Sequence, residues 1–204
     1  MNLLISVLFS YILGSIPTGY IFGKLIKGID IREHGSGNVG ATNALRVLGT
    51  KIGIITLILD VLKGYFAMFI ASRIITDPTN LHLIIIGFAV IIGHIFTIFL
   101  KFKGGKGVAT SAGVFIFLTP IPVIFALIVF ILTVSLSRFI SLGSILASLT
   151  LFVTELIMNF RNQFSDKEKL ILVAIVMSFI IIRHISNIKR IFAGNENKLT
   201  FGKK

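Results

Sequence analysis

Long apolar stretches dominate this chain of 204 residues and limit what it can fold into. They run over residues 2–25, 52–72, 82–100, 108–136, 139–160 and 170–186. About 20 residues at a helical rise of about 1.5 Å cross a hydrocarbon core of about 30 Å. Hydrophobic residues make up 55% of the chain and charged residues only 14%, more apolar than a soluble domain of this size requires. The sequence therefore predicts an all-α, multi-pass membrane protein.

The fourth stretch, 108–136, is too long for one upright helix. It contains Pro120 and Pro122, and two prolines this close favour a tight turn between two short helices. The expected fold is thus a bundle of seven transmembrane helices. Residues 1–13 look like the start of a signal peptide, but no Lys or Arg precedes them and no cleavage site is clear, so we expect a first span. No repeat or linker is evident, and one integral membrane domain over 1–204 is expected.

Lysine and arginine counts in the loops predict the orientation of the helices. With seven spans, one side together with the C-terminal tail holds 15 of these residues, including Lys203 and Lys204, and the other side holds 4. The positive-inside rule then places the N-terminus outside and the C-terminus in the cytoplasm. Six spans give a poorer division of 11 against 8. Five spans give 17 against 2, but leave 170–186, which is too apolar for water, outside the membrane.

The net charge of +12 would also suit a nucleic-acid partner. These cations lie mostly in short loops, where they set membrane topology, so no nucleic-acid partner is expected. The chain has no cysteine, which excludes disulfides and thiolate metal sites. It also lacks a His and carboxylate cluster at ligand spacing, and we expect neither a metal nor a cofactor.

A lysine surrounded by glycines lies between two predicted spans, in the run Phe102-Lys103-Gly104-Gly105-Lys106-Gly107-Val108-Ala109-Thr110. Glycines let the backbone turn N–H groups toward an anion, Lys106 adds a positive charge, and the next helix adds its positive dipole end. Leu100 stands where a Walker A loop has glycine, so an ATPase or kinase is disfavoured. A basic membrane anchor is the alternative, but it does not need three glycines. The run predicts a phosphate-binding loop.

A second polar cluster, residues 33–46, is expected on the same cytoplasmic side. It combines three glycines, several small hydrogen-bonding side chains and Arg46, whose guanidinium can bind a phosphate in bidentate fashion. A solvated loop is the alternative interpretation, although the density of Gly and Asn argues against it.

Two further clusters are also expected on this side. Ser137 and Ser141 could contact a polar substrate, but a serine that caps a helix explains them as well. His184 and Asn187 are three residues apart and are expected to share a helix face. A belt of snorkelling cations explains the Lys and Arg of 183–190, but not the His and Asn pair.

Several polar residues fall inside the predicted spans. Asp60 and Lys63 are three residues apart, and each would be costly alone in lipid, so a mutual ion pair is favoured. His94 near the end of its span could either make a structural hydrogen bond or bind a ligand. Residues 15–19, which include Pro17, are expected to interrupt the first span next to a cavity or a packed helix.

These residues together predict a cationic, glycine-rich site that faces the cytoplasm and suits a phosphate. Two classes of function fit: an enzyme that acts on a phosphorylated lipid precursor, and a carrier of a small organic or phosphate anion. The cations on one side favour the enzyme. A carrier needs a midplane site, often at matching broken helices, and only the first span is broken.

The motifs resemble those of the bacterial acyl-phosphate:glycerol-3-phosphate acyltransferases, the PlsY family. The resemblance extends from Ser15 to Arg190 and includes 35–43 with Arg46, Asp60-x-x-Lys63-Gly64, Gly93-His94, 104–110, Ser137-Arg138-x-x-Ser141 and His184-x-x-Asn187. It implies a seven-helix protein of the bacterial plasma membrane whose active site faces the cytoplasm. It also implies acyl transfer from acyl-phosphate to the 1-hydroxyl of glycerol 3-phosphate, giving lysophosphatidic acid and inorganic phosphate. The implied partners are the lipid bilayer and the two substrates, with no obligatory protein partner.

The resemblance also suggests roles for individual residues. Lys106, Ser141 and His184 are the candidate catalytic residues. Acyl-phosphate is expected to bind at Gly104, Gly105, Lys106, Gly107, Val108, Ala109 and Thr110. Glycerol 3-phosphate is expected to bind at Ser36, Asn38, Asn43, Arg46, Lys106, Ser141, His184 and Asn187. The phosphate of the donor is the expected proton acceptor, and His184 as general base is the competing hypothesis.

Overall fold

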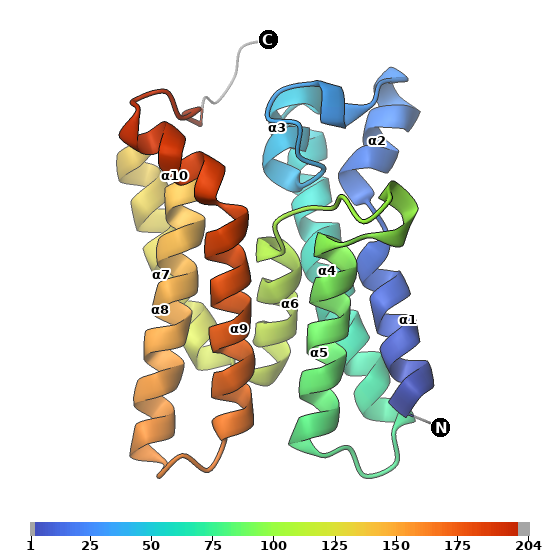
Figure 1. Ribbon diagram of the computed structural model, residues 1–204, viewed down its shortest axis with the longest axis vertical. Coiled ribbons are helices and arrows are strands. Elements are labelled where there is room, and N and C mark those ends of the chain that lie inside the picture. Colours follow the sequence, from blue (N-terminus) through green and yellow to red (C-terminus); the bar gives the residue numbers. More distant parts are fainter. Residues whose placement is uncertain (1–2, 200–204) are drawn as a thin grey trace. The chain divides into compact units, whose positions relative to one another are not determined.

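The computed structural model describes residues 3–199, and over this range the fold contains helices and no strand (Figure 1). Lys203 and Lys204, which entered the charge count, lie outside the described residues. The α-helices are α1 (Leu3–Ser15), α2 (Thr18–Lys27), α3 (Ala41–Leu48), α4 (Thr50–Ile74), α5 (Asn80–Ile95), α6 (Val108–Leu118), α7 (Pro120–Ser137), α8 (Ile140–Arg161), α9 (Lys167–Arg183) and α10 (Ile185–Phe192). Two short 3₁₀-helices are η1 (Ile31–Glu33) and η2 (Ile98–Leu100).

Five of the described helical segments are long and apolar enough to cross a membrane: Leu3–Lys27, Thr50–Ile74, Asn80–Leu100, Pro120–Ser137 and Ile140–Arg161. The pair α9 and α10 is a sixth candidate, with a bend of 52°. α6 is apolar but has only 11 residues, or about 16 Å at the helical rise, roughly half of a hydrocarbon core. The all-helical membrane class is therefore confirmed.

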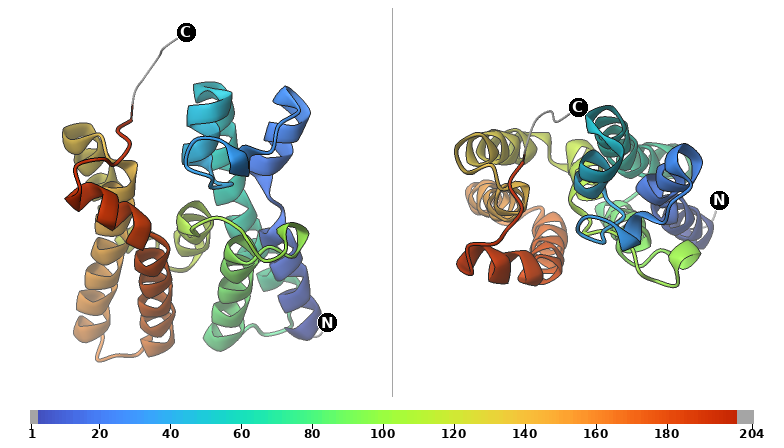
Figure 2. Two further views of the ribbon diagram at one scale, coloured as in Figure 1. Left: turned by 45° about the horizontal axis from the view of Figure 1, so that its top comes forward. Right: turned by 90° about the horizontal axis from the view of Figure 1, so that it is seen from above.

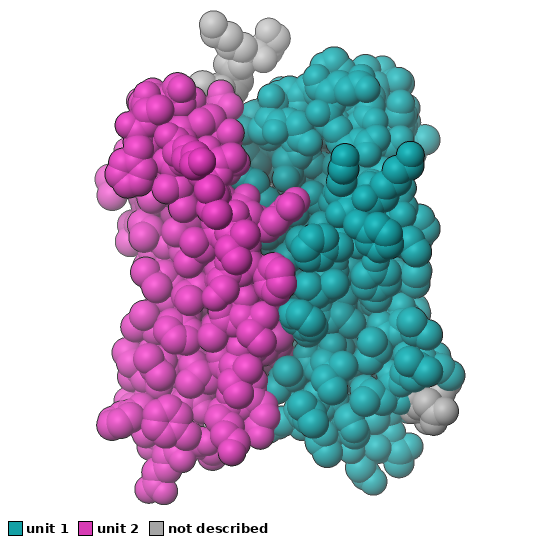
Figure 3. Space-filling view, in the orientation of Figure 1, with its two compact units in different colours: residues 1–117 teal, residues 118–204 magenta. Residues whose placement is uncertain are grey.

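The predicted division of 108–136 is also confirmed. α6 ends at Leu118, and α7 begins at Pro120, a residue that fits the first turn of a helix because its missing N–H is not needed there. The chain forms two compact units, residues 1–117 and 118–204, which are coloured separately in Figure 3.

In the first unit, α1 packs against α5 and α4, and α3 packs against α4. Glycines allow the closest approaches. A Cβ placed on Gly14 of α1 would lie 2.1 Å from the carbonyl oxygen of Val90, and one on Gly113 of α6 would lie 1.9 Å from that of Val61. These helix backbones are thus in direct contact, as small residues permit within membranes.

The first apolar segment is interrupted where the sequence predicts it. α1 ends at Ser15 and α2 begins at Thr18, with Pro17 between them. Thr18 donates its hydroxyl hydrogen bond to Asp60 of α4, so the interruption lies next to a buried charged group.

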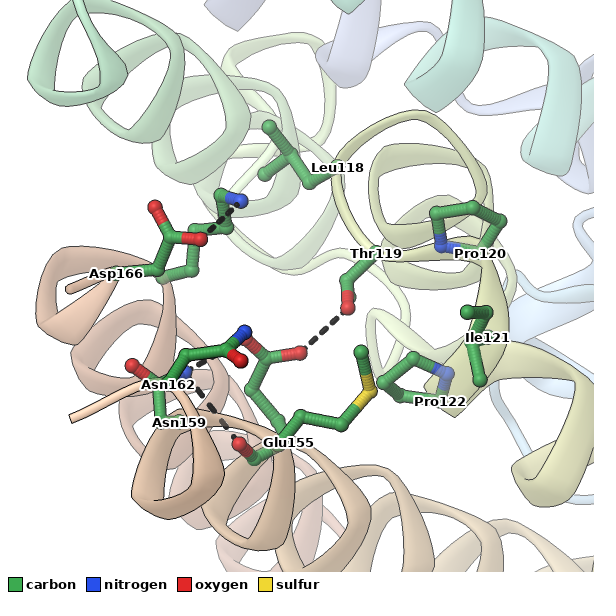
Figure 4. A pocket seen from close by; sticks show the side chains of 11 residues that line it. Leu118, Thr119, Pro120, Ile121, Pro122, Glu155, Asn159, Asn162 and Asp166 are labelled. Atoms are coloured by element: carbon green, nitrogen blue, oxygen red, sulfur yellow. Dashed lines mark hydrogen bonds and ion pairs between the residues drawn. The ribbon is translucent and has the colours of Figure 1, made fainter. Parts of the chain in front are cut away.

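In the second unit, α8 packs against both α7 and α9, and α10 turns away from the axis of α9 (Figure 2). Glu155 of α8 is almost fully buried, although it lies in an apolar helix. It accepts hydrogen bonds from the hydroxyl of Thr119 and from Asn159 Nδ2, the latter at 2.9 Å (Figure 4). These side chains line a cavity of about 140 Å³ beside Pro120 and Pro122, and they anchor the turn between α6 and α7 to α8.

Candidate active site

The buried amide of Asn43, at the start of α3, holds the loop that precedes it. Asn43 Nδ2 donates to the carbonyl oxygens of Ile31 and His34, both at 3.0 Å, and of Asn38 at 2.8 Å. Its Oδ1 accepts the backbone N–H of Ser36 at 2.8 Å. Both polar atoms of this side chain bond to the loop, so Asn43 shapes the cluster 33–46, and its predicted contact with a ligand stays a prediction.

The other polar residues of this cluster are partly or fully accessible to solvent. Ser36 is exposed, between two glycines with positive φ. Asn38 is half-buried, and its Oδ1 accepts the N–H of Gly40 at 2.8 Å. Arg46 is half-buried in the last turn of α3. The first unit therefore presents a hydroxyl and a guanidinium on one short loop and helix.

The predicted ion pair in α4 is present. Lys63 Nζ lies 2.8 Å from Asp60 Oδ1, and both side chains are almost fully buried. Asp60 also accepts from the Thr18 hydroxyl at 3.0 Å, and Lys63 donates to the Ile16 carbonyl at 3.0 Å. His94 Nδ1 lies 3.9 Å from Asp60 Oδ1, beyond hydrogen-bond length. The polar groups thus satisfy one another, as burial at membrane depth requires.

The glycine loop folds back onto the end of α5. Gly104 N–H donates to the carbonyl of Ile95 and Gly105 N–H to that of His94, both at 3.0 Å. Gly107 has a φ of +88°, and its carbonyl accepts the first helical bond of α6, from Ser111. The loop therefore enters α6 as predicted, and Lys106 is half-buried beside the helix start.

A carboxylate that the sequence analysis did not select organises the second unit. Glu196 Oε1 accepts from the Ser141 hydroxyl at 2.8 Å and from Asn187 Nδ2 at 2.6 Å. Its Oε2 accepts from Arg190 Nε at 2.8 Å. Ser141 in the first turn of α8 and Asn187 in α10 are both buried, and Glu196 joins them although it lies beyond the last helix.

Glu196 is charged at neutral pH. Burial alone would raise the pKa of its carboxyl, but the hydrogen bonds from Asn187, Arg190 and Ser141 outweigh burial and hold that pKa below its ordinary value. A signal existed in the sequence, because Glu196 is a lone acid in a basic tail.

His184 lies at the bend between α9 and α10, where it ends α9 and caps α10 three residues before Asn187, and the shared face of the two side chains stays a prediction. At this bend the His184 N–H donates to the carbonyl of Ile181, one residue short of Ile180, the α-helical partner. Its Nδ1 lies 2.7 Å from the carbonyl oxygen of Ile180. A carbonyl oxygen can only accept, so Nδ1 is the donor in this contact.

The described structure thus groups the predicted residues within each unit. The first unit contains Ser36, Asn38, Arg46 and the loop 104–110, and the second contains Ser141, His184 and Asn187. Among residues 3–199, no three His, Cys, Asp or Glu side chains come together in a way that could hold a metal ion.

Comparison with known proteins identifies similar sequences and folds. A family profile described as glycerol-3-phosphate acyltransferase matches residues 4–194. Glycerol-3-phosphate acyltransferase 2 of Bacillus anthracis is 47% identical over 199 residues, which cover 98% of this chain and all of the relative. The glycerol-3-phosphate acyltransferase of Bacillus subtilis is 42% identical, with 98% of each chain covered. The crystal structure of PlsY, an integral membrane glycerol 3-phosphate acyltransferase, in its glycerol 3-phosphate form, matches with a TM-score of 0.87 and 37% identity, over 97% of this chain and 96% of that one.

Proposed function

Because the chain belongs to the glycerol-3-phosphate acyltransferase family, we propose that it transfers a fatty acyl group from acyl-phosphate to the 1-hydroxyl of glycerol 3-phosphate. The products are lysophosphatidic acid and inorganic phosphate. Acyl transfer to glycerol 3-phosphate follows from the family, and the acyl-phosphate donor and the acylated position are the parts that we add.

The glycine loop is the observation that carries the choice of donor. Gly104 and Gly105 direct their N–H groups to α5, so these two residues shape the loop. The first N–H groups of α6, at Val108 and Ala109, have no acceptor within the helix and suit a phosphate, together with the Lys106 ammonium. In acyl-phosphate that phosphate is the leaving group, and its developing charge is stabilised there.

The remaining residues bind and orient glycerol 3-phosphate in this proposal. In the first unit, Arg46 binds its phosphate, assisted by Ser36 and Asn38, and Lys106 serves both substrates. In the second unit, Ser141, His184 and Asn187 orient the glycerol hydroxyls. Asn43 holds the loop that carries Ser36 and Asn38, and Glu196 holds Ser141 and Asn187.

The reaction forms a bond between the acyl carbon and O1 of glycerol and breaks the bond from that carbon to the phosphate oxygen. The hydroxyl proton leaves with the phosphate of the donor, and the protein contributes positioning and electrostatic stabilisation. His184 Nε2 is the competing acceptor. A His184→Gln variant that retains most of its kcat excludes that role.

We also propose that both units work as one domain with seven membrane spans, of which α6 is the shortest. The protein lies in the plasma membrane of a bacterium, with its N-terminus outside and its active site facing the cytoplasm. The chain lacks cysteine, so single cysteines report sidedness directly. In spheroplasts, an impermeant maleimide is expected to label Ser165→Cys in the loop between α8 and α9 and to leave Ser36→Cys unlabelled until the membrane is opened. The reverse pattern contradicts the orientation.

The decisive experiment uses purified protein in detergent with acyl-phosphate and labelled glycerol 3-phosphate, and scores labelled lysophosphatidic acid. Lys106→Ala is expected to lower kcat/KM by about 100-fold, the size typical of losing one charge-stabilising donor. Lys103→Ala is the matched control, because this lysine of the same loop is exposed and lies before the glycines. Its activity is expected to stay close to that of the wild type.

Other outcomes lead to different conclusions. If lysophosphatidic acid forms from acyl-CoA or acyl-carrier-protein but not from acyl-phosphate, the protein is still an acyltransferase and the proposed donor is wrong. If Lys106→Ala and Lys103→Ala lower kcat/KM equally, the phosphate site is not at Lys106. No product with any donor from folded protein contradicts the proposal and favours the anion carrier, for which uptake of glycerol 3-phosphate into proteoliposomes is the test.

A further inference from the structure

The side chain of His94 lies directly beneath the glycine loop. A Cβ placed on Gly105 would lie 2.2 Å from His94 Nε2, 2.9 Å from Cε1 and 3.1 Å from Cδ2. Real Cβ atoms do not approach other atoms so closely, so the imidazole occupies the space that any larger residue at 105 would need. The backbones are also joined, because Gly105 N–H donates to the His94 carbonyl at 3.0 Å.

The other edge of the imidazole faces a buried carboxylate. His94 is only 7% exposed, and its Nδ1 faces the Asp60 carboxylate at 3.9 Å. Asp60 is fixed in turn by Lys63 at 2.8 Å and by Thr18 at 3.0 Å. These contacts link the interruption of the first apolar segment, α4 and the end of α5 into one buried polar network. The loop therefore rests on buried groups that contact one another.

We propose that His94 is a positioning residue that sets the place of the loop 104–110 against the phosphate of the acyl donor. This inference rests on the proposed function of the loop. His94 acts through Gly105 and does not touch the substrate. A loop placed in advance loses less freedom when the phosphate binds, and a displacement of about 1 Å lowers the rate by up to about 100-fold.

The test is a double-mutant cycle between Gly105→Ala and His94→Asn. Asparagine keeps a polar atom where Nδ1 faces Asp60, but it lacks Nε2 and Cε1, the two atoms closest to a Cβ at 105. Gly105→Ala alone is expected to raise the KM for acyl-phosphate about tenfold, with the KM for glycerol 3-phosphate unchanged. Adding His94→Asn is expected to recover at least half of that loss on a logarithmic scale.

Gly104→Ala is the matched control. A Cβ on Gly104 would meet the carbonyl oxygens of His94 at 2.1 Å and of Ile95 at 2.7 Å, which are backbone atoms that no side-chain substitution removes. His94→Asn is therefore expected to give no recovery in the Gly104→Ala background. Melting temperatures of all variants in detergent are measured alongside, since a purely structural role would change the melting temperature without a selective change in the KM for the donor.

The outcomes separate this inference from the function on which it rests. If Lys106→Ala raises the KM for acyl-phosphate while Gly105→Ala and His94→Asn act independently, the positioning role is overturned and the phosphate loop stands. Equal recovery in the Gly104→Ala background also overturns it. If Lys106→Ala leaves the donor KM unchanged, the loop does not bind the donor, and the positioning proposal falls with it.

Discussion

Removal of the Glu196 carboxylate is expected to reduce activity although this residue lies outside every helix. Glu196→Ala takes away the common acceptor of the Ser141 hydroxyl and the Asn187 amide. Both donors are buried, so neither finds a replacement partner without rearrangement. The two side chains then lose the positions in which we propose that they meet glycerol 3-phosphate.

The magnitude follows from the two hydrogen bonds. A buried donor left without a partner costs about 1–3 kcal/mol, so two cost about 2–6 kcal/mol. Water that enters the space left by the carboxylate partly replaces it, which favours the lower end of this range, about 2–3 kcal/mol. At about 1.4 kcal/mol per factor of ten, this corresponds to a loss of about 30- to 150-fold in kcat/KM for glycerol 3-phosphate.

Glu196→Gln is the matched control. Its amide oxygen can still accept from Ser141 and Asn187, and only the contact with the partly exposed Arg190 is lost, which is worth about 1 kcal/mol or less. The assay is steady-state transfer from acyl-phosphate with glycerol 3-phosphate varied. If Glu196→Ala keeps wild-type kcat/KM, or if Glu196→Gln is as impaired as Glu196→Ala, the reasoning from the shared acceptor is wrong.

The remaining predictions concern stability in detergent. Lys63→Met leaves the Asp60 charge buried without its ammonium partner and is expected to cost about 3–5 kcal/mol, whereas Lys63→Met with Asp60→Asn costs less; thermal melting of both variants checks this. Gly113→Ala is expected to lower the melting temperature by several degrees because its Cβ meets the Val61 carbonyl, and an unchanged value would contradict direct backbone contact. Asn43→Ala is expected to expose the loop 31–43 to limited proteolysis, with wild-type cleavage arguing against its scaffold role. The melting temperature of the wild type is expected to exceed that of Glu196→Gln at neutral pH, and the difference to shrink as pH falls below the ordinary pKa of a glutamate, about 4.3, and to vanish below the lowered pKa of the folded Glu196 carboxyl. The sign follows from the lowered pKa of the folded carboxyl, whose stabilisation is present above the unfolded value and lost on protonation.

Much of the fold was predictable because membrane helices are specified by local composition. The apolar stretches, the turn at Pro120 and the interruption at Pro17 all leave direct marks on the sequence. The ion pair of Asp60 and Lys63 was predictable for the same reason, since a helix places residues three apart on one face.

The site was predictable only in its residue types. Long-range contacts carry no local signature, so the sequence could not place Glu196 between Ser141 and Asn187, or the imidazole of His94 under Gly105. Asn43 illustrates the same limit, because a loop scaffold and a substrate ligand use the same amide. The bend at His184 could not be predicted either, because side-chain spacing assumes a continuous helix, whereas the His184 N–H pairs with the carbonyl of Ile181 in place of that of Ile180.

The attachment of the C-terminal segment matters for activity more than for membrane insertion. Glu196 joins Ser141 and Asn187, and the Leu199 N–H donates to the carbonyl of Arg138 at 2.7 Å. All described helices precede this segment along the chain. This segment therefore adds no helix to the bundle and instead connects polar residues of α8 and α10. A chain truncated before residue 196 would keep all the described helices and yet lack the Glu196 carboxylate that bonds to Ser141 and Asn187. Activity is thus expected to be more sensitive to loss of this segment than membrane insertion is.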